Sequence, residues 1–255
     1  INTIVTLHAE FFFTGSCGHS LECEKWMNGC GKCPQKWKAT KSYFFDTSHL
    51  AWKKMNDTFS NFDNSNIIFA SVSPWLAQRA KRSTILGDKD HFIIKNGVNT
   101  NVFHPVDFSS LKTKLNLENK KVILFVTPNF SLDINSLKGG YYVVELARKL
   151  LSNDFIIIII GGERGMANLP QNVLSIGRIK DQYEMAKYYS LANLSIIASK
   201  RETFSMVCAE SLCCGTPVIG FKAGGPESIE LDDYTEFVDY GDIINLENAV
   251  HKWIN

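Results

Sequence analysis

Apolar and polar positions along the second half of the chain follow the pattern of short strands connected by helices. Brief apolar runs, bounded by glycine or polar residues, predict buried strands at 121–126, 155–160, 173–176, 194–198 and 217–220. Longer segments with helical periodicity predict helices at 140–151, 182–191, around Glu210 and at 246–254. Strands that alternate with helices favour an α/β fold, with a parallel sheet flanked by helices on both faces.

The first part of the chain has a less regular pattern. We expect strands at 1–8, 67–71 and 92–95, helices at 48–59 and 75–86, and irregular structure at 9–48. Polar residues and Pro105 at 99–110 predict a linker, so we place a first domain at 1–105 and a second at 106–255. Because the chain opens directly on a strand-like segment, we expect the first domain to be incomplete and truncated at its N-terminus.

Composition narrows the class of protein further. The formal net charge is +1 and the basic residues do not cluster, which argues against nucleic-acid binding. The longest apolar run, 155–160, is too short to cross a bilayer, and 1–13 lacks the features of a signal peptide. We therefore expect a cytoplasmic protein with reduced cysteines. The acidic stretch 227–242 predicts a solvated surface.

Two glutamates eight residues apart, Glu202 and Glu210, mark the strongest candidate site. We expect Glu202 just before a helix and Glu210 two turns into it, at the carboxyl edge of the sheet, where open α/β folds bind ligands. The free amides of a helix N-terminus favour a phosphate. We place that N-terminus at Thr203, Phe204 and Ser205.

The surrounding residues carry a resemblance to a known family. Ala209–Leu212, then Cys214–Ile219, then Gly224–Glu227 follow the first glutamate in a characteristic order. This run resembles the signature of retaining glycosyltransferases of family 4, which have two Rossmann-like domains of the GT-B type. The resemblance implies transfer of a sugar from a nucleotide-diphosphate donor to an acceptor hydroxyl, with retention at the anomeric carbon by same-face attack.

The resemblance also implies roles for residues of the second domain. Glu210 would accept hydrogen bonds from the ribose and Glu202 would contact the sugar. Lys138 and Gly139 would hold the diphosphate, with Gly224 and Gly225 near the same phosphates, and the turn containing Arg178 would seat the base. The chain departs from the family at 127–130, where an arginine is usual and none is present. The family needs no redox cofactor and no catalytic divalent metal.

In the first domain, His8 matches a family histidine that orients the reacting centre. The family often has aspartate next, whereas this chain has Ala9, so Glu10 is a candidate substitute. A half-buried structural histidine is the alternative for His8.

Four cysteines form a cluster that sugar transfer does not require. Cys30 and Cys33 have the Cys-x2-Cys spacing of a structural zinc site, with Cys17 and Cys23 as the other ligands. Buried free thiols or a disulfide are the alternatives. The pattern, with Trp26 inside it, recurs in a subgroup of bacterial polysaccharide and capsule enzymes that this chain resembles. That subgroup implies a saccharide or lipid-linked saccharide acceptor and peripheral contact with the cytoplasmic membrane.

Three other functions fit parts of the same pattern. A nucleotide-sugar epimerase or phosphorylase would share the architecture. A truncated fragment could bind the nucleotide sugar without catalysis. Residues 17–33 could form a zinc-dependent interaction module.

Overall fold

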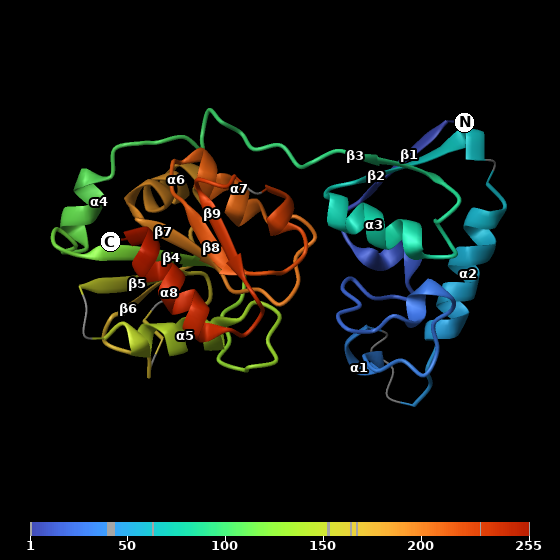
Figure 1. Ribbon diagram of the computed structural model, residues 1–255, viewed down its shortest axis with the longest axis horizontal. Coiled ribbons are helices and arrows are strands. Elements are labelled where there is room, and N and C mark those ends of the chain that lie inside the picture. Colours follow the sequence, from blue (N-terminus) through green and yellow to red (C-terminus); the bar gives the residue numbers. More distant parts are fainter. Residues whose placement is uncertain are drawn as a thin grey trace. The chain divides into compact units, whose positions relative to one another are not determined.

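The chain folds as two compact units, residues 1–96 and 97–255 (Figure 1). The structure is a computed structural model that describes residues 2–39, 44–62, 64–151, 154–163, 165–166, 168–229 and 231–254. The division falls before the predicted boundary at 105, because Val102 and Phe103 are buried in the core of the second unit with Leu117 and Tyr189. The segment expected to be a linker therefore belongs largely to the second unit.

The first unit contains a parallel three-stranded sheet in the order β1–β2–β3. Its elements are β1 (Thr3–Leu7), η1 (Glu10–Phe13), η2 (Lys25–Met27), α1 (Lys36–Ala39), α2 (Ser48–Ser60), η3 (Asn64–Asn66), β2 (Ile67–Ser71), α3 (Pro74–Arg82) and β3 (Asp90–Ile93). Ser73 caps the N-terminus of α3, since its side chain accepts a hydrogen bond from the Leu76 amide. The helix ends before the predicted Leu86, because Ser83 adopts an extended conformation.

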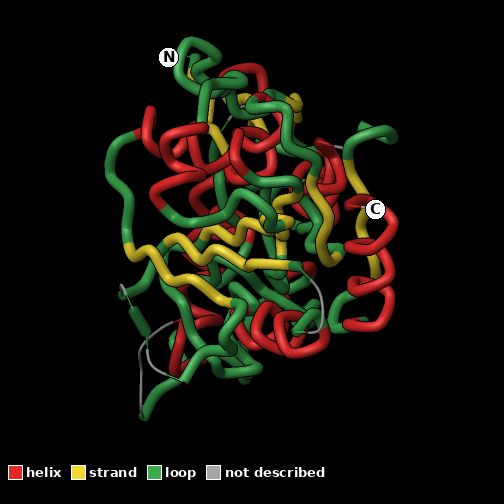
Figure 2. The backbone as a smooth tube through the Cα atoms, turned by 90° about the vertical axis from the view of Figure 1, so that its left-hand side faces the viewer, coloured by secondary structure: helices red, strands yellow, loops and turns green. Residues whose placement is uncertain are grey.

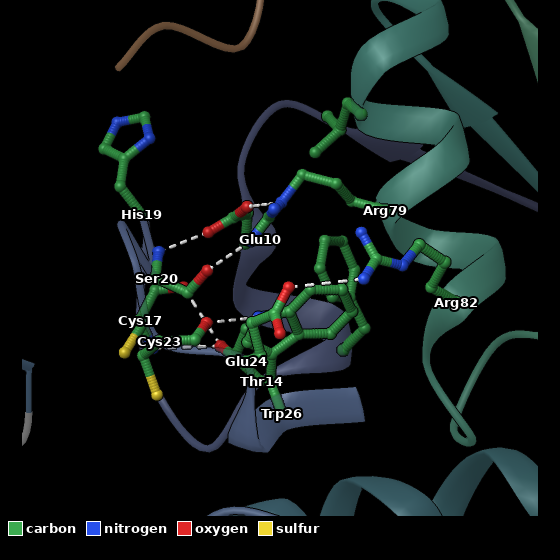
Figure 3. A network of polar contacts seen from close by, with 12 residues as sticks. Glu10, Thr14, Cys17, His19, Ser20, Cys23, Glu24, Trp26, Arg79 and Arg82 are labelled. Carbon is green, nitrogen blue, oxygen red and sulfur yellow. Dashed lines mark hydrogen bonds and ion pairs between the residues drawn. The ribbon is translucent and has the colours of Figure 1, made fainter. Parts of the chain in front are cut away.

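The long segment before α2 is organised around a buried ion pair. The Glu10 side chain is fully buried and pairs with Arg79 of α3, while its other oxygen accepts the Ser20 amide (Figure 3). The Arg79 guanidinium also stacks on Trp26, at 4.7 Å, and on Trp75, at 5.0 Å. Glu10 is thus engaged inside the first unit, and this position does not support the suggested role beside the exposed His8.

We predict that Glu10→Ala destabilises the first unit by about 3–5 kcal/mol, because it leaves the Arg79 charge buried without its partner. The matched control is Glu24→Ala, which removes the exposed pair of Glu24 with Arg82, 3.3 Å apart, and should cost less than about 1 kcal/mol. Urea unfolding followed by tryptophan fluorescence measures both. An equal decrease in the free energy of unfolding in the two variants would contradict this interpretation of the buried pair.

The second unit contains a six-stranded sheet in the order β6–β5–β4–β7–β8–β9, and every neighbouring pair is parallel. The strands are β4 (Lys121–Val126), β5 (Phe155–Ile160), β6 (Val173–Gly177), β7 (Leu194–Ile197), β8 (Val218–Phe221) and β9 (Thr235–Val238). Numbered within the unit, this is the 3-2-1-4-5-6 order of a doubly wound Rossmann sheet. The strand order reverses between β4 and β7, which is where such sheets bind ligands.

Helices cover both faces of this sheet (Figure 2). They are α4 (Ser109–Lys114), α5 (Gly140–Lys149), α6 (Gln182–Leu191), α7 (Met206–Cys213) and α8 (Ile243–Ile254), with a 3-10 turn η4 (Pro226–Ile229). One apolar cluster joins α5 and α8 to the sheet, and a second joins α4 and α6 to it. The predicted α/β class, with a parallel sheet flanked by helices, is confirmed.

The acidic stretch 227–242 contains an unpredicted edge strand, β9, whose Glu236 is engaged by Lys252 and by the Trp253 indole N–H. Asp232 and Asp233 in this stretch are exposed, as predicted for a solvated surface. One local prediction in this unit was wrong. Helix α7 begins at Met206, so Glu210 lies little more than one turn into it, not two. No helix in the described part of the chain combines the length and apolar character needed to cross a membrane.

Candidate functional site

The two loops that follow β4 and β7 meet at the point where the strand order reverses. Gly139, which precedes α5, has a positive φ of 68°, and a Cβ atom there would lie 2.0 Å from the Ala198 carbonyl oxygen. The Lys200 amide also donates to the Leu137 carbonyl, 2.8 Å away. Only glycine allows this approach, so the sequence places the two loops in direct backbone contact.

An ion pair joins these loops. The Lys138 ammonium lies 2.6 Å from a Glu202 carboxylate oxygen, and the Ser199 hydroxyl donates to the same oxygen at 2.7 Å. Both side chains remain partly exposed, Lys138 at 30% and Glu202 at 18%. The structure therefore brings together two predicted site residues from separate loops and places a charged pair within reach of solvent.

The glycine pair after β8 supports the Glu202 backbone. The Glu202 amide donates to the Ala223 carbonyl, and the Gly225 amide donates to the Glu202 carbonyl at 2.9 Å. A Cβ atom on Gly225 would lie 2.3 Å from the Thr203 carbonyl carbon, so a larger residue does not fit. The Gly224 amide is engaged by the Glu227 carboxylate, at 2.8 and 2.9 Å. A phosphate at that amide would have to displace Glu227.

The start of α7 differs from the prediction. Thr203 and Phe204 precede the helix, and Phe204 is buried. Ser205 is the N-cap, with a positive φ of 89° and a side chain that accepts from the Cys208 amide at 3.3 Å. The first helical amide is thus that of Met206. Of the three residues predicted at the helix N-terminus, Ser205 therefore lies there as the N-cap, whereas Thr203 and Phe204 precede the helix.

Glu210 lines a pocket at the carboxyl ends of the strands. The pocket has a volume of about 350 Å³, within the range of about 300–1,000 Å³ for small-molecule sites. Its lining residues come from the ends of three strands, β4, β5 and β6, and from helices α6 and α7: Val126, Thr127, Pro128, Ile160, Gly161, Arg178, Ile179, Met185, Tyr189, Val207 and Glu210. Only glycine fits at position 161 of the pocket wall, because a Cβ atom there would lie 1.6 Å from the Thr127 carbonyl oxygen.

The Glu210 carboxylate is oriented by a tyrosine that sequence reasoning missed. The Tyr189 hydroxyl donates to Glu210 Oε2 at 2.9 Å. Burial raises the pKa of the Glu210 carboxyl above its ordinary value, and this hydrogen bond offsets part of the rise. Burial, together with the nearby Glu210 charge, holds the pKa of Tyr189 well above its usual range. The hydroxyl therefore stays protonated and acts as a donor.

The Gly-Thr-Pro turn after α7 fixes α7 against α6. The Thr216 hydroxyl donates to the Tyr189 carbonyl at 2.6 Å, and the buried Ser211 hydroxyl donates to the Ser195 hydroxyl at 2.8 Å. Gly215 ends the helix with a positive φ of 80°. The turn thus holds Glu210 in register with Tyr189. Its sequence was recognisable as a motif, but nothing in it pointed to the tyrosine.

Arg178 reaches the loop that lacks an arginine of its own. Its guanidinium donates to the Pro128 carbonyl and to the Asn129 side-chain oxygen, both at 3.2 Å. Arg178 remains exposed and lines the Glu210 pocket. A cation is therefore present beside this loop, supplied by the β6 end rather than by the loop itself.

The other predicted residues lie in the first unit. His8 is exposed and directly follows β1. The four clustered cysteines are free thiols that line one small cavity. Burial, reinforced by the neighbouring thiols, raises the pKa of Cys17 to about 12.

Comparison with known proteins decides the family. Residues 107–255 match the family described as glycosyl transferases group 1. The chain belongs to this family. The match covers every residue of the switch-point loops and of the Glu210 pocket.

Members of this family and their structures resemble the chain over part of their length. The D-inositol 3-phosphate glycosyltransferase of Streptosporangium roseum is 29% identical over 154 residues, which cover 52% of this chain and 34% of that protein. The sucrose-phosphate synthase of Thermosynechococcus elongatus has a TM-score of 0.66 at 23% identity, covering 86% of this chain and 57% of that one. Anabaena HepE in complex with UDP-glucose has a TM-score of 0.63 at 18% identity, covering 83% and 59%. These structures establish the GT-B type of α/β fold, and the chain spans about a third of the length of the curated relative.

Proposed function

We propose that this protein transfers a sugar from a nucleotide-diphosphate donor to an acceptor hydroxyl, with retention at the anomeric carbon. The observation that carries the proposal is the Lys138–Glu202 ion pair at the switch point of the family domain. A partly exposed cation beside a carboxylate matches a ligand that brings a diphosphate joined to a sugar. Anabaena HepE, which shares the fold, has been solved with UDP-glucose.

The ion pair suggests how the donor binds. A diphosphate carries more negative charge than one carboxylate, so it should replace Glu202 as the partner of Lys138. Glu202 would then be free to accept hydrogen bonds from the sugar hydroxyls, while Ser199 keeps its carboxylate in place. We assign Lys138 to the leaving diphosphate and Glu202 to the sugar ring. Gly139 permits the approach of the two loops.

The pocket around Glu210 suits the nucleoside. Glu210, held by Tyr189, would accept hydrogen bonds from the ribose hydroxyls, and the apolar Ile179 and Met185 would contact the base. Arg178 lines the same pocket and would supply the positive charge missing from the 127–130 loop. We keep Thr203, Phe204, Ser205, Gly224 and Gly225 as residues that shape the phosphate side of the site.

We propose same-face attack as the reaction. The bond from the anomeric carbon to the leaving diphosphate oxygen breaks as the bond to the acceptor oxygen forms on the same face. The acceptor proton passes to the departing phosphate oxygen, so no enzymic nucleophile is needed. Lys138 would stabilise the charge that develops on the leaving group, which is the kind of interaction that contributes most to such catalysis. His8 would orient the reacting centre.

We further propose that the acceptor is a saccharide, free or lipid-linked, of bacterial surface polysaccharide synthesis. The cysteine pattern of the first unit supports this choice, because it resembles that subgroup. The enzyme would then work in the cytoplasm or in peripheral contact with the membrane.

Product formation tests the proposal. The protein is incubated with uridine, guanosine or adenosine diphosphate sugars, with and without saccharide acceptors. We expect nucleoside diphosphate to be released only when an acceptor is present, and nuclear magnetic resonance to show an unchanged anomeric configuration. Release without an acceptor would favour an epimerase or phosphorylase, and tight binding without release would favour a non-catalytic fragment.

We predict that Tyr189→Phe weakens nucleotide binding by about tenfold, because it removes one hydrogen bond worth about 1.5 kcal/mol from the Glu210 carboxylate. The pKa of Glu210 should rise further in this variant, so its charge is lost at higher pH and the defect should grow as the pH falls. Titration calorimetry at neutral and mildly acidic pH measures both effects. Tyr183→Phe, on the exposed side of the same helix, is the control. Equal affinities in the two variants would refute the orienting role.

A further inference from the structure

The four clustered cysteines of the first unit surround one cavity. Cys17, Cys23, Cys30 and Cys33 all line it, together with Gly15 and Trp26. The cavity has a volume of about 10 Å³, which is room for about one water-sized occupant. All four residues are only partly exposed free thiols. The four cysteines singled out by their sequence spacing therefore also lie together in space, around a cavity large enough for a single ion.

The backbone around Cys30 and Cys33 forms a tight turn with the features of a metal-binding loop. The Gly15 amide donates to Cys30 Sγ at 3.1 Å, the type of second-layer hydrogen bond that orients a ligand. Gly31, with φ of 148°, and Lys32, with φ of 46°, provide the unusual conformations that the turn requires. The Lys25 ammonium closes the turn by donating to the carbonyls of Gly31, at 3.2 Å, and Lys32, at 2.8 Å.

The other two cysteines are held by the buried network of the first unit. The Thr14 hydroxyl oxygen accepts the Cys17 amide at 3.0 Å, and the Trp26 indole N–H donates to the Cys23 carbonyl at 2.7 Å. Figure 3 shows the Cys17 and Cys23 sulfur atoms on the same side of this network. Trp26 in turn packs under Arg79. Both cysteines thus have fixed backbones and sulfur atoms that face one side.

We propose that Cys17, Cys23, Cys30 and Cys33 bind one zinc ion as four thiolates and that this ion holds the Cys-rich segment of the first unit together. Four sulfur ligands in tetrahedral geometry, two of them in a Cys-x2-Cys turn, are typical of structural zinc sites. A disulfide would involve only two of the four sulfurs. It would leave the presence of the other two cysteines at the same cavity unexplained.

The thiols have still to converge on the ion. In the described part of the chain, no group of three or more His, Cys, Asp or Glu side chains is already arranged to hold a metal ion. All four cysteines already line the same cavity, so the ion would draw their sulfurs together there. Zinc would then join the four cysteines through four bonds to sulfur. Binding should therefore stabilise the first unit.

Metal analysis of the whole protein tests the proposal. The wild-type chain, expressed with zinc and purified under reducing conditions, should contain about one zinc ion per molecule by mass spectrometry. Cys30→Ser should lose most of this zinc, whereas Cys213→Ser, a partly exposed cysteine of α7, should retain it. A strong chelator should lower the melting temperature of the wild-type protein and leave that of Cys30→Ser unchanged.

A second measurement on the wild-type protein covers the case in which Cys30→Ser fails to fold. Replacing zinc with cobalt should produce intense visible bands of tetrahedral cobalt and sulfur-to-cobalt charge-transfer absorption in the near ultraviolet. Wild-type protein that folds without zinc and gives no such spectrum with cobalt would overturn the proposal. So would a disulfide among these four cysteines found by peptide mapping, or full zinc content in a folded Cys30→Ser variant.

Discussion

Lys138→Ala is expected to lower the turnover number by about 10²- to 10³-fold while the protein stays folded, because it removes the cation that stabilises the leaving diphosphate. Lys138 is partly exposed and its partner Glu202 keeps the hydrogen bond from Ser199, so the loss of the pair should cost little stability. The rate of nucleoside diphosphate release at saturating donor and acceptor measures the effect.

The control for this variant is Lys222→Ala. Lys222 is also a lysine paired with a carboxylate, that of Asp239 at 2.7 Å, but it follows β8 and does not belong to the loops at the switch point between β4 and β7. Its removal should leave turnover within about twofold of wild type, in keeping with the small worth of surface pairs. Similar rates for Lys138→Ala and wild type would show that another group stabilises the leaving diphosphate.

Gly139→Ala should lower turnover by about 10²-fold without removing any functional group. A Cβ atom at this position would lie 2.0 Å from the Ala198 carbonyl oxygen, so the loops carrying Lys138 and Glu202 must move apart. Displacement of reacting groups by about 1 Å can cost this much in rate. The variant should also lose stability, because alanine is strained at a φ of 68°.

Gly165→Ala separates the two effects of Gly139→Ala. Gly165 has nearly the same φ, 65°, but no atom lies within 4 Å of the position its Cβ would take. In this variant the free energy of unfolding should fall only by the conformational cost of about 1–2 kcal/mol, and the activity should be kept. Steady-state kinetics and urea unfolding on both variants provide the comparison. Comparable activity in the two proteins would show that the contact between the loops does not position the site.

The sequence predicted the second unit well because its four central strands, β5, β4, β7 and β8, are buried on both faces. The apolar runs at 121–126 and 155–160 coincide with β4 and β5, and helix α6 begins and ends where its pattern indicated. The short strand β9 was missed, since Thr235–Val238 contains a glutamate and lies in an acidic stretch. Its place depends on pairing with β8, and local sequence does not encode such long-range pairing.

The sequence predicted most residues of the candidate site but not the contacts between them. Lys138 and Glu202 were expected from the family resemblance, yet their ion pair depends on the strand order that brings β4 beside β7. Ser199 lies three residues before Glu202, and nothing in its sequence position singles it out. Tyr189 was hidden among the buried residues of α6, because a tyrosine on the apolar face of a helix is usually a packing residue. The start of α7 was misplaced because Ser205 adopts a left-handed conformation that few serines adopt.

Titration of nucleoside diphosphates into the wild-type, Lys138→Ala and Glu210→Gln proteins tests the central claim most directly. The claim is that the carboxyl edge of the second sheet, between the Lys138 loop and Glu210, holds the donor nucleotide. We expect one of UDP, GDP and ADP to bind wild-type protein with a stoichiometry of about one, and both variants to bind it at least about tenfold more weakly. Wild-type affinity in both variants, or no binding of any of the three, would contradict it.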